Sequence, residues 1–295
     1  MTAGVIWAAL AGIGFGFSQL ANRGVNRGAE AMSAATAMVT AMLGALIIAT
    51  VVTGEIADVG AMPATAAGWF VAAALVHFLV GWTLFAVSQQ RIGPSRTASV
   101  LSTNPVMAAL IAAVVIGQDL RSITWIGVLA VTIGVATVAG TGLRQSARSG
   151  TGLVAILAAT LMFSISPVLV TYGLDSFDAP LAGLTIGIAA TVPCMHLATR
   201  VLTGSWVQLG RPVAGWLLLG AVSGGFAITA QWTAFDLIPV GTVVSLQQLS
   251  TPVVLFVGPV LLSAPGERSD ARMLIGTSLI IGGAVLVALF GRALT

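Results

Sequence analysis

Charged residues are scarce in this chain of 295 residues. Only 7% of the residues are Asp, Glu, Lys or Arg, and lysine is absent, whereas 57% are hydrophobic. A soluble protein of this length needs far more charge to cover its surface. The composition therefore excludes an ordinary soluble domain. It predicts an all-α, polytopic membrane protein whose main partner is the lipid bilayer.

The sequence also lacks the residues on which most enzymes and metalloproteins depend. Its single cysteine, Cys194, lies in an apolar run, so no intrachain disulfide can form. The sequence contains no Cys/His ligand set, nucleophile motif, paired carboxylates or Walker A motif. The glycine-rich residues 12–16 follow no strand, so they do not indicate a nucleotide loop. We expect no catalytic residue, metal, cofactor or nucleotide, and no enzyme activity.

Ten apolar stretches are long enough to cross a bilayer, which takes about 20 residues. They cover residues 3–21, 33–53, 66–89, 95–116, 123–142, 152–173, 180–202, 213–235, 241–262 and 272–290. The connecting loops carry glycine and proline and are too short for a soluble domain. The first stretch has no basic segment before it, so we expect a retained span and not a cleaved leader.

The two sets of five stretches repeat one another. Residues 91–106 resemble residues 237–253, and each segment carries a proline, Pro105 or Pro252, 147 residues apart. Other corresponding pairs are Phe15/Phe163, Ser18/Ser166, Gly127/Gly276 and Gly134/Gly283. Because five is odd, the second set must enter the membrane upside down. We predict two inverted five-helix repeats, residues 1–142 and 151–295, joined by a linker at 143–150.

Arginine placement bears on topology and not on nucleic-acid binding. The pI is about 10.4, but the twelve arginines lie in or near short loops. Only Arg121 and Arg292 fall on one side of the predicted bundle, and the other ten fall on the opposite side. The positive-inside rule then places both termini outside the cytoplasm.

A polar residue inside a span is a candidate for function, because burying it in lipid is costly. His77 lies near the middle of the third stretch, and Gln231 projects from the corresponding face of the eighth. We expect both to face a shared midplane, where His77 contacts solute or accepts a proton. The alternative for His77 is a hydrogen bond to a neighbouring backbone carbonyl. His196, near the end of the seventh stretch, is interpreted as structural.

Two amides flank the repeated prolines. Asn104 and Gln248 lie beside Pro105 and Pro252, and a proline inside a helix kinks it and frees a carbonyl. We interpret both prolines as hinges and both amides as cavity-lining groups. The neighbouring serines and threonines could instead repair or join helices. Ser18, Ser166 and Trp82 are further candidates for contact with solute, although Trp82 could also pack against lipid.

The acidic residues are informative by their position. All nine lie in loops or at the ends of the predicted spans. No carboxylate is therefore available in mid-helix to bind a proton, a sodium ion or an organic cation. Any coupling to protons would depend on His77.

The chain resembles the drug/metabolite transporter superfamily in its EamA-type branch. The similarity is clearest over residues 92–138 and recurs more loosely over residues 238–287. It rests on Pro105, Pro252, the four paired glycines and the Gly266-Glu267-Arg268 turn. The corresponding first-half turn, Gly117-Gln118-Asp119, departs from the pattern. The resemblance implies ten helices around a central cavity and, in contrast to the arginine count, cytoplasmic termini.

These observations predict a secondary, non-ATP transporter of the cytoplasmic (inner) membrane. We expect alternating access and a small neutral or zwitterionic solute such as an amino acid, with export implied by the family resemblance. A drug or multidrug efflux carrier is the main alternative, and a lipid flippase is a second. One chain carries both repeats, so a monomer is sufficient and a dimer is compatible. The sequence leaves solute, coupling ion and direction open.

Overall fold

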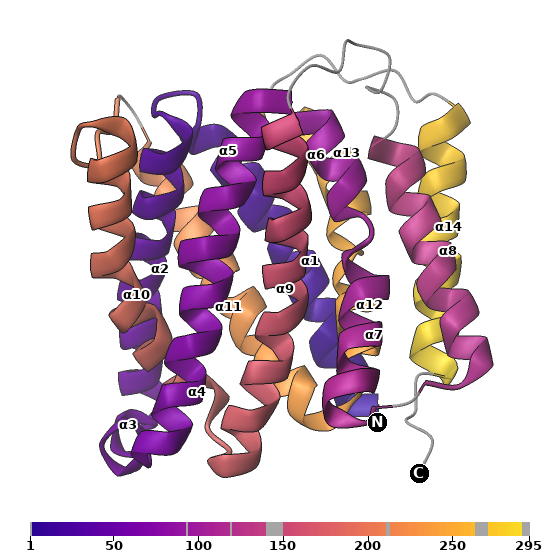
Figure 1. Cartoon of the computed structure of the whole chain (residues 1–295), viewed down its shortest axis with the longest axis horizontal. Helices are drawn as coiled ribbons and strands as arrows, with labels where there is room; N and C mark the ends of the chain where they lie inside the picture. The colour runs from indigo at the N-terminus through magenta and orange to yellow at the C-terminus, as the bar shows by residue number, and fades with distance from the viewer. Residues whose placement is uncertain are drawn as a thin grey trace.

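The computed structural model describes residues 2–92, 94–118, 120–139, 150–210, 213–262 and 271–290. In these ranges the chain is a bundle of helices that run up and down beside one another (Figure 1). Eight helices are long and apolar enough to cross a membrane. The prediction of an all-α, multi-pass membrane protein is therefore confirmed.

The helices of the first half are α1 (Thr2–Val25), α2 (Ala31–Thr53), α3 (Ile56–Ala61), α4 (Ala64–Ala74), the π-helix η1 (Leu75–Gly81), α5 (Trp82–Ile92), α6 (Pro94–Leu101), α7 (Asn104–Ile116) and α8 (Ser122–Ala139). The second half contains α9 (Gly150–Ser176), α10 (Pro180–Thr203), α11 (Ala214–Leu237), α12 (Val240–Gln247), α13 (Ser250–Leu261) and α14 (Ala271–Phe290). Except for residue 150, the predicted linker lies outside the described residues, as does the Gly266-Glu267-Arg268 turn.

Two predicted spans are interrupted near their prolines. Residues 95–116 form α6 and α7, separated by a turn at Ser102 and Thr103, and Pro105 lies in the first turn of α7. Proline has no N–H to donate and clashes with the preceding turn, so it is best tolerated where a helix begins. Similarly, Gln248 and Leu249 separate α12 from α13, which contains Pro252 near its start.

The number of full-length spans is smaller than expected. Asn104–Ile116 and Ser122–Val138 are apolar helices but are shorter than the eight candidate spans. In the described residues the fourth predicted stretch is therefore not a single helix, and the interruption before Pro105 accounts for this. The fifth predicted stretch is one helix, α8, over its described part, and its last residues, 140–142, lie outside the described residues.

The two edges of the bundle are antiparallel helix pairs that join the halves of the chain. α8 packs against α14 at one edge, and α2 packs against α10 at the opposite edge (Figure 1). Between them, α1 packs chiefly against α11, while α9 packs against α4, η1 and α5. These inner helices bring the middle of the first half into contact with the middle of the second.

Phe70 of α4 occupies a hollow made by glycines. A Cβ at Gly173, Gly183 or Gly187 would lie 2.6–2.7 Å from an atom of Phe70. The ring is fully buried and stacks on Trp232 of α11, with ring centroids 5.5 Å apart. Small residues at these three positions thus allow α4, α9 and α10 to approach closely around one aromatic side chain.

Candidate functional site

His77 lies in the π-helix η1. At the end of this segment the backbone N–H of Trp82 bonds to the carbonyl of His77, five residues back. A π-helix is wider than an α-helix, and such turns are frequent at functional sites. The imidazole is half-buried and lies against two rings, Phe78 at 4.7 Å and Phe163 at 4.9 Å between centroids. The π turn therefore places His77 among aromatic groups in the middle of a span.

A small cavity of about 10 Å³ lies beside His77. It is lined from three helical segments by His77, Phe78, Ser166, Ile228, Gln231 and Trp232. Its size leaves room for about one water molecule. The structure thus brings together three residues singled out from sequence: His77 of η1, Ser166 of α9 and Gln231 of α11. None of the six lining residues carries a carboxylate or a guanidinium.

Two of the polar groups around this cavity, those of Ser166 and Gln231, are bonded to protein atoms. Ser166 donates its hydroxyl to the carbonyl of Ala73 at 3.1 Å. Gln231, which is 5% exposed, donates Nε2 to Oε1 of Gln247 in a short hydrogen bond. Because an unsatisfied buried amide costs about 1–3 kcal/mol, this bond matters for the site. Both groups therefore already have hydrogen-bond partners within the protein.

The other candidates from sequence lie around the cavity but do not line it. Asn104 accepts from Ser164 at 2.8 Å through Oδ1, and Gln248 donates to the carbonyl of Val244 in its own helix at 3.5 Å. Ser18 lies near Gly224, where an added Cβ would be 3.0 Å from the serine hydroxyl. The rings of Trp82 and Phe78 are 5.8 Å apart.

Sequence reasoning did not select Gln247 or Phe78 for this site. Gln247 and Gln248 are adjacent amides, and only the turn that follows α12 decides which of them reaches Gln231. Phe78 follows His77 directly, and both line the same cavity because the π turn changes the face that the segment presents. The sequence of η1, LVHFLVG, contains no signal that would have indicated this turn.

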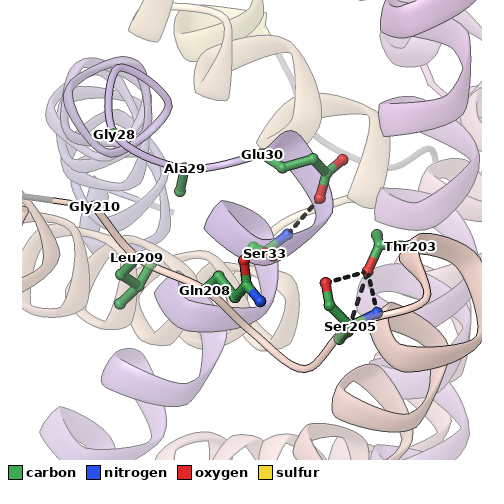
Figure 2. A pocket seen from close by; sticks show the side chains of 9 residues that line it. All are labelled: Gly28, Ala29, Glu30, Ser33, Thr203, Ser205, Gln208, Leu209 and Gly210. Carbon is green, nitrogen blue, oxygen red and sulfur yellow. Dashed lines mark hydrogen bonds between the residues drawn. The ribbon is translucent and has the colours of Figure 1, made fainter.

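A second, larger pocket of about 440 Å³ lies at the end of the bundle where α2 begins and α10 ends (Figure 2). Glu30 caps α2 there by accepting from the backbone N–H groups of Met32 and Ser33 at 3.0 and 3.1 Å. Gly210 N donates to Gly28 O at 2.6 Å and ties the two loops together. This pocket lies at the level of the loops, whereas the cavity beside His77 lies within the spans.

Residues 2–140 match the model of the EamA-like transporter family. This first part of the chain is similar to the transporters of that family. The chain also shares its fold with a protein of known crystal structure. The TM-score is 0.78 and the sequence identity 18%, and the match covers 98% of this chain and 97% of the other. A search of curated proteins finds no match. The similarity of residues 2–140 to EamA-like transporters and the eight apolar helices of membrane length agree with a multi-pass membrane protein.

Proposed function

We propose that this EamA-like protein is a secondary carrier of small neutral or zwitterionic metabolites, such as amino acids, in the cytoplasmic membrane. The observation that carries the proposal is the uncharged polar cavity formed by His77, Ser166 and Gln231. An imidazole, a hydroxyl and an amide can both donate and accept hydrogen bonds. They match a solute with no net charge and supply no fixed charge to hold an ion.

We infer that transport proceeds outward by alternating access between two inverted repeats. The pairing of helices supports this arrangement, because α1 packs on α11 and its counterpart α9 packs on α4 and α5. Gly127 and Gly134 of α8 approach Gly283 and Gly276 of α14 reciprocally. The turns before Pro105 and Pro252 supply a hinge in each half, where a broken helix can change direction.

Flux of labelled L-leucine, L-phenylalanine and L-threonine in proteoliposomes tests this function. Wild-type protein should carry at least one of them, and His77→Ala and Gln231→Ala should each reduce the rate by about tenfold, as expected when a buried polar contact to the solute is removed. Gln90→Ala is the control, since Gln90 is exposed and bonds only to Glu30 at the surface. Unchanged flux in both cavity variants would remove these residues from the site.

The second candidate is efflux of apolar or aromatic drugs. It is favoured by the rings around the cavity, in which Phe78, Trp82, Phe163 and Trp232 surround the polar groups. Flat cationic or aromatic compounds stack readily on such rings. Uptake of ethidium in the same proteoliposomes, with no flux of any of the three amino acids, would favour this candidate over the first.

A further inference from the structure

Gln231 is the only lining residue of the cavity with a side-chain amide, and that amide is already bonded. Its Nε2 donates to Oε1 of Gln247, which comes from a different helix of the same half. The apolar lining residues around it, Ile228 and Trp232, offer no side-chain acceptor. The hydroxyl of Ser166 is donated to a backbone carbonyl. Gln231 would therefore lose the side-chain acceptor that it has in this structure if Gln247 moved away.

Gln247 lies at an interruption between two helices, where a change in helix direction would move its side chain. It is the last residue of α12, and the next two residues form the turn that separates α12 from α13. Its side chain is half-buried, and its neighbour Gln248 turns back to Val244 in the same helix. The residue that holds the Gln231 amide thus lies at the joint of a broken helix, so bending at this joint would move its side chain.

The size of the cavity indicates what a solute must do to enter. A space of about 10 Å³ accommodates about one water molecule, so an amino acid does not fit in the cavity in this arrangement of the helices. Leaving a buried amide without a hydrogen-bond partner costs the full desolvation penalty of that group. A solute that replaces Gln247 and brings an acceptor oxygen to Nε2 of Gln231 restores this hydrogen bond.

We propose that Gln247 is a specificity-determining residue that occupies the place of the solute. Its amide oxygen stands where a carbonyl or carboxylate oxygen of the solute binds Gln231 during transport. The inference rests on the proposed function and adds two points to it: the chemical class of the solute, and the internal group that competes with it. A solute without a carbonyl or carboxylate oxygen cannot replace Gln247 fully.

Kinetics of L-leucine uptake in proteoliposomes test the competition. Gln247→Ala should lower KM by about fivefold, the factor that one net hydrogen bond commonly contributes, because the solute no longer displaces an internal partner. Vmax should fall, since release is no longer assisted by the return of Gln247. Gln247→Asn, which keeps an amide but is too short to reach Gln231, should behave in the same way. Gln90→Ala is the matched control and should leave both constants unchanged.

Competition by two leucine derivatives tests the chemical class. L-leucinamide retains a carbonyl oxygen, whereas L-leucinol does not. L-leucinamide should inhibit wild-type uptake at least about tenfold better than L-leucinol, because a site built for a hydrogen bond rejects an analogue that lacks it. In Gln231→Ala the two derivatives should inhibit equally.

The outcomes separate this inference from the proposed function. If wild-type protein transports L-leucine but Gln247→Ala and Gln247→Asn have the wild-type KM, the role of Gln247 is overturned. Equal inhibition of wild-type uptake by L-leucinamide and L-leucinol overturns it as well. Both results leave the transporter function standing. Absence of L-leucine, L-phenylalanine and L-threonine uptake by wild-type protein overturns the proposed solute class and this inference with it.

Discussion

The two antiparallel helix pairs at the edges of the bundle are joined in different ways. In the α8–α14 pair, a Cβ on Gly134 would lie 2.7 Å from the carbonyl oxygen of Gly276, and one on Gly283 would lie 2.7 Å from that of Gly127. In the α2–α10 pair, side chains form the contacts: Thr36 bonds to Thr199 at 2.7 Å, and the hydroxyl oxygens of Thr50 and Thr185 lie 2.9 Å apart. One pair is joined by backbone proximity and the other by polar side chains.

This difference bears on how each pair can move. In lipid the hydrophobic effect does not drive helices together, so close packing and interhelical hydrogen bonds must hold them. Glycine contacts fix the distance between two backbones and leave no space for sliding. Threonine hydroxyls can instead return to their own helices, and Thr50, Thr185 and Thr199 already bond to carbonyls four residues back. We expect the α2–α10 pair to separate at lower cost than the α8–α14 pair.

The largest effect should come from filling the glycine contact. Gly134→Leu would place side-chain atoms against Gly276 O and Ile280 N, backbone atoms that cannot rotate away. Overpacking of this kind costs about 1–3 kcal/mol and sometimes more, so the variant should unfold at lower SDS content than wild type. Gly282→Leu is the control, because nothing lies within 4 Å of a Cβ at Gly282. Equal loss of stability in both variants would contradict a close α8–α14 contact.

A smaller effect is expected from the hydroxyl contact. Thr199 donates to the carbonyl of Met195, so Thr36 is the donor in the bond between the two threonines. Thr36→Val keeps the shape and removes that donor, which should cost about 0.6 kcal/mol, the average for interhelical bonds in a membrane protein. Thr53→Val, which loses bonds only within α2, serves as the control. A double-mutant cycle with Thr199→Val should assign the difference to the pair, and zero coupling would exclude it.

The α2–α10 pair also shows what a histidine can do in a span. His196 lies 3.0 Å from Thr40 through Nε2, in line with its interpretation from sequence as structural. His77, by contrast, stacks on two rings and lines a cavity. The two histidines of this chain are therefore distinguished by their surroundings, which depend on helix packing and not on residue type.

Much of the architecture followed from composition and spacing. Apolar runs of membrane length are hard to interpret in any other way, and they located most of the helices. Pro105 and Pro252 indicated a kink within each of two continuous spans, whereas the structure ends one helix and begins another just before each proline. The length of α7 did not follow, because the position of a turn before a proline depends on tertiary packing that apolar content does not encode.

The candidate site was predictable to a smaller extent. His77, Ser166 and Gln231 stood out because polar residues are rare inside spans, and the structure brings these three to one cavity. The interhelical bond of Gln247 depends on the local turn after α12, and the π-helix around His77 depends on how α4 and α5 pack on α9. Neither feature leaves a periodic signal in the sequence, so each required coordinates.

The smallest predicted effect concerns Glu55, which follows α2 at the end opposite Glu30. Burial raises the pKa of its carboxyl above the ordinary 4.5, a hydrogen bond from the backbone of Ala182 in α10 opposes this, and the charge of Asp58 adds to the rise. The folded chain therefore binds this proton more tightly than the unfolded chain. The stabilisation by this bound proton is complete below the ordinary pKa and is lost as pH rises through the higher pKa of the folded state.

Glu55→Gln remains neutral, so its unfolding free energy should fall less than that of wild type between about pH 4 and about pH 7. Asp58→Asn should flatten the profile less, because it removes only the weakest of the three causes. Identical pH profiles for wild type and Glu55→Gln would show that this end of the α2–α10 pair is as well solvated as the unfolded chain.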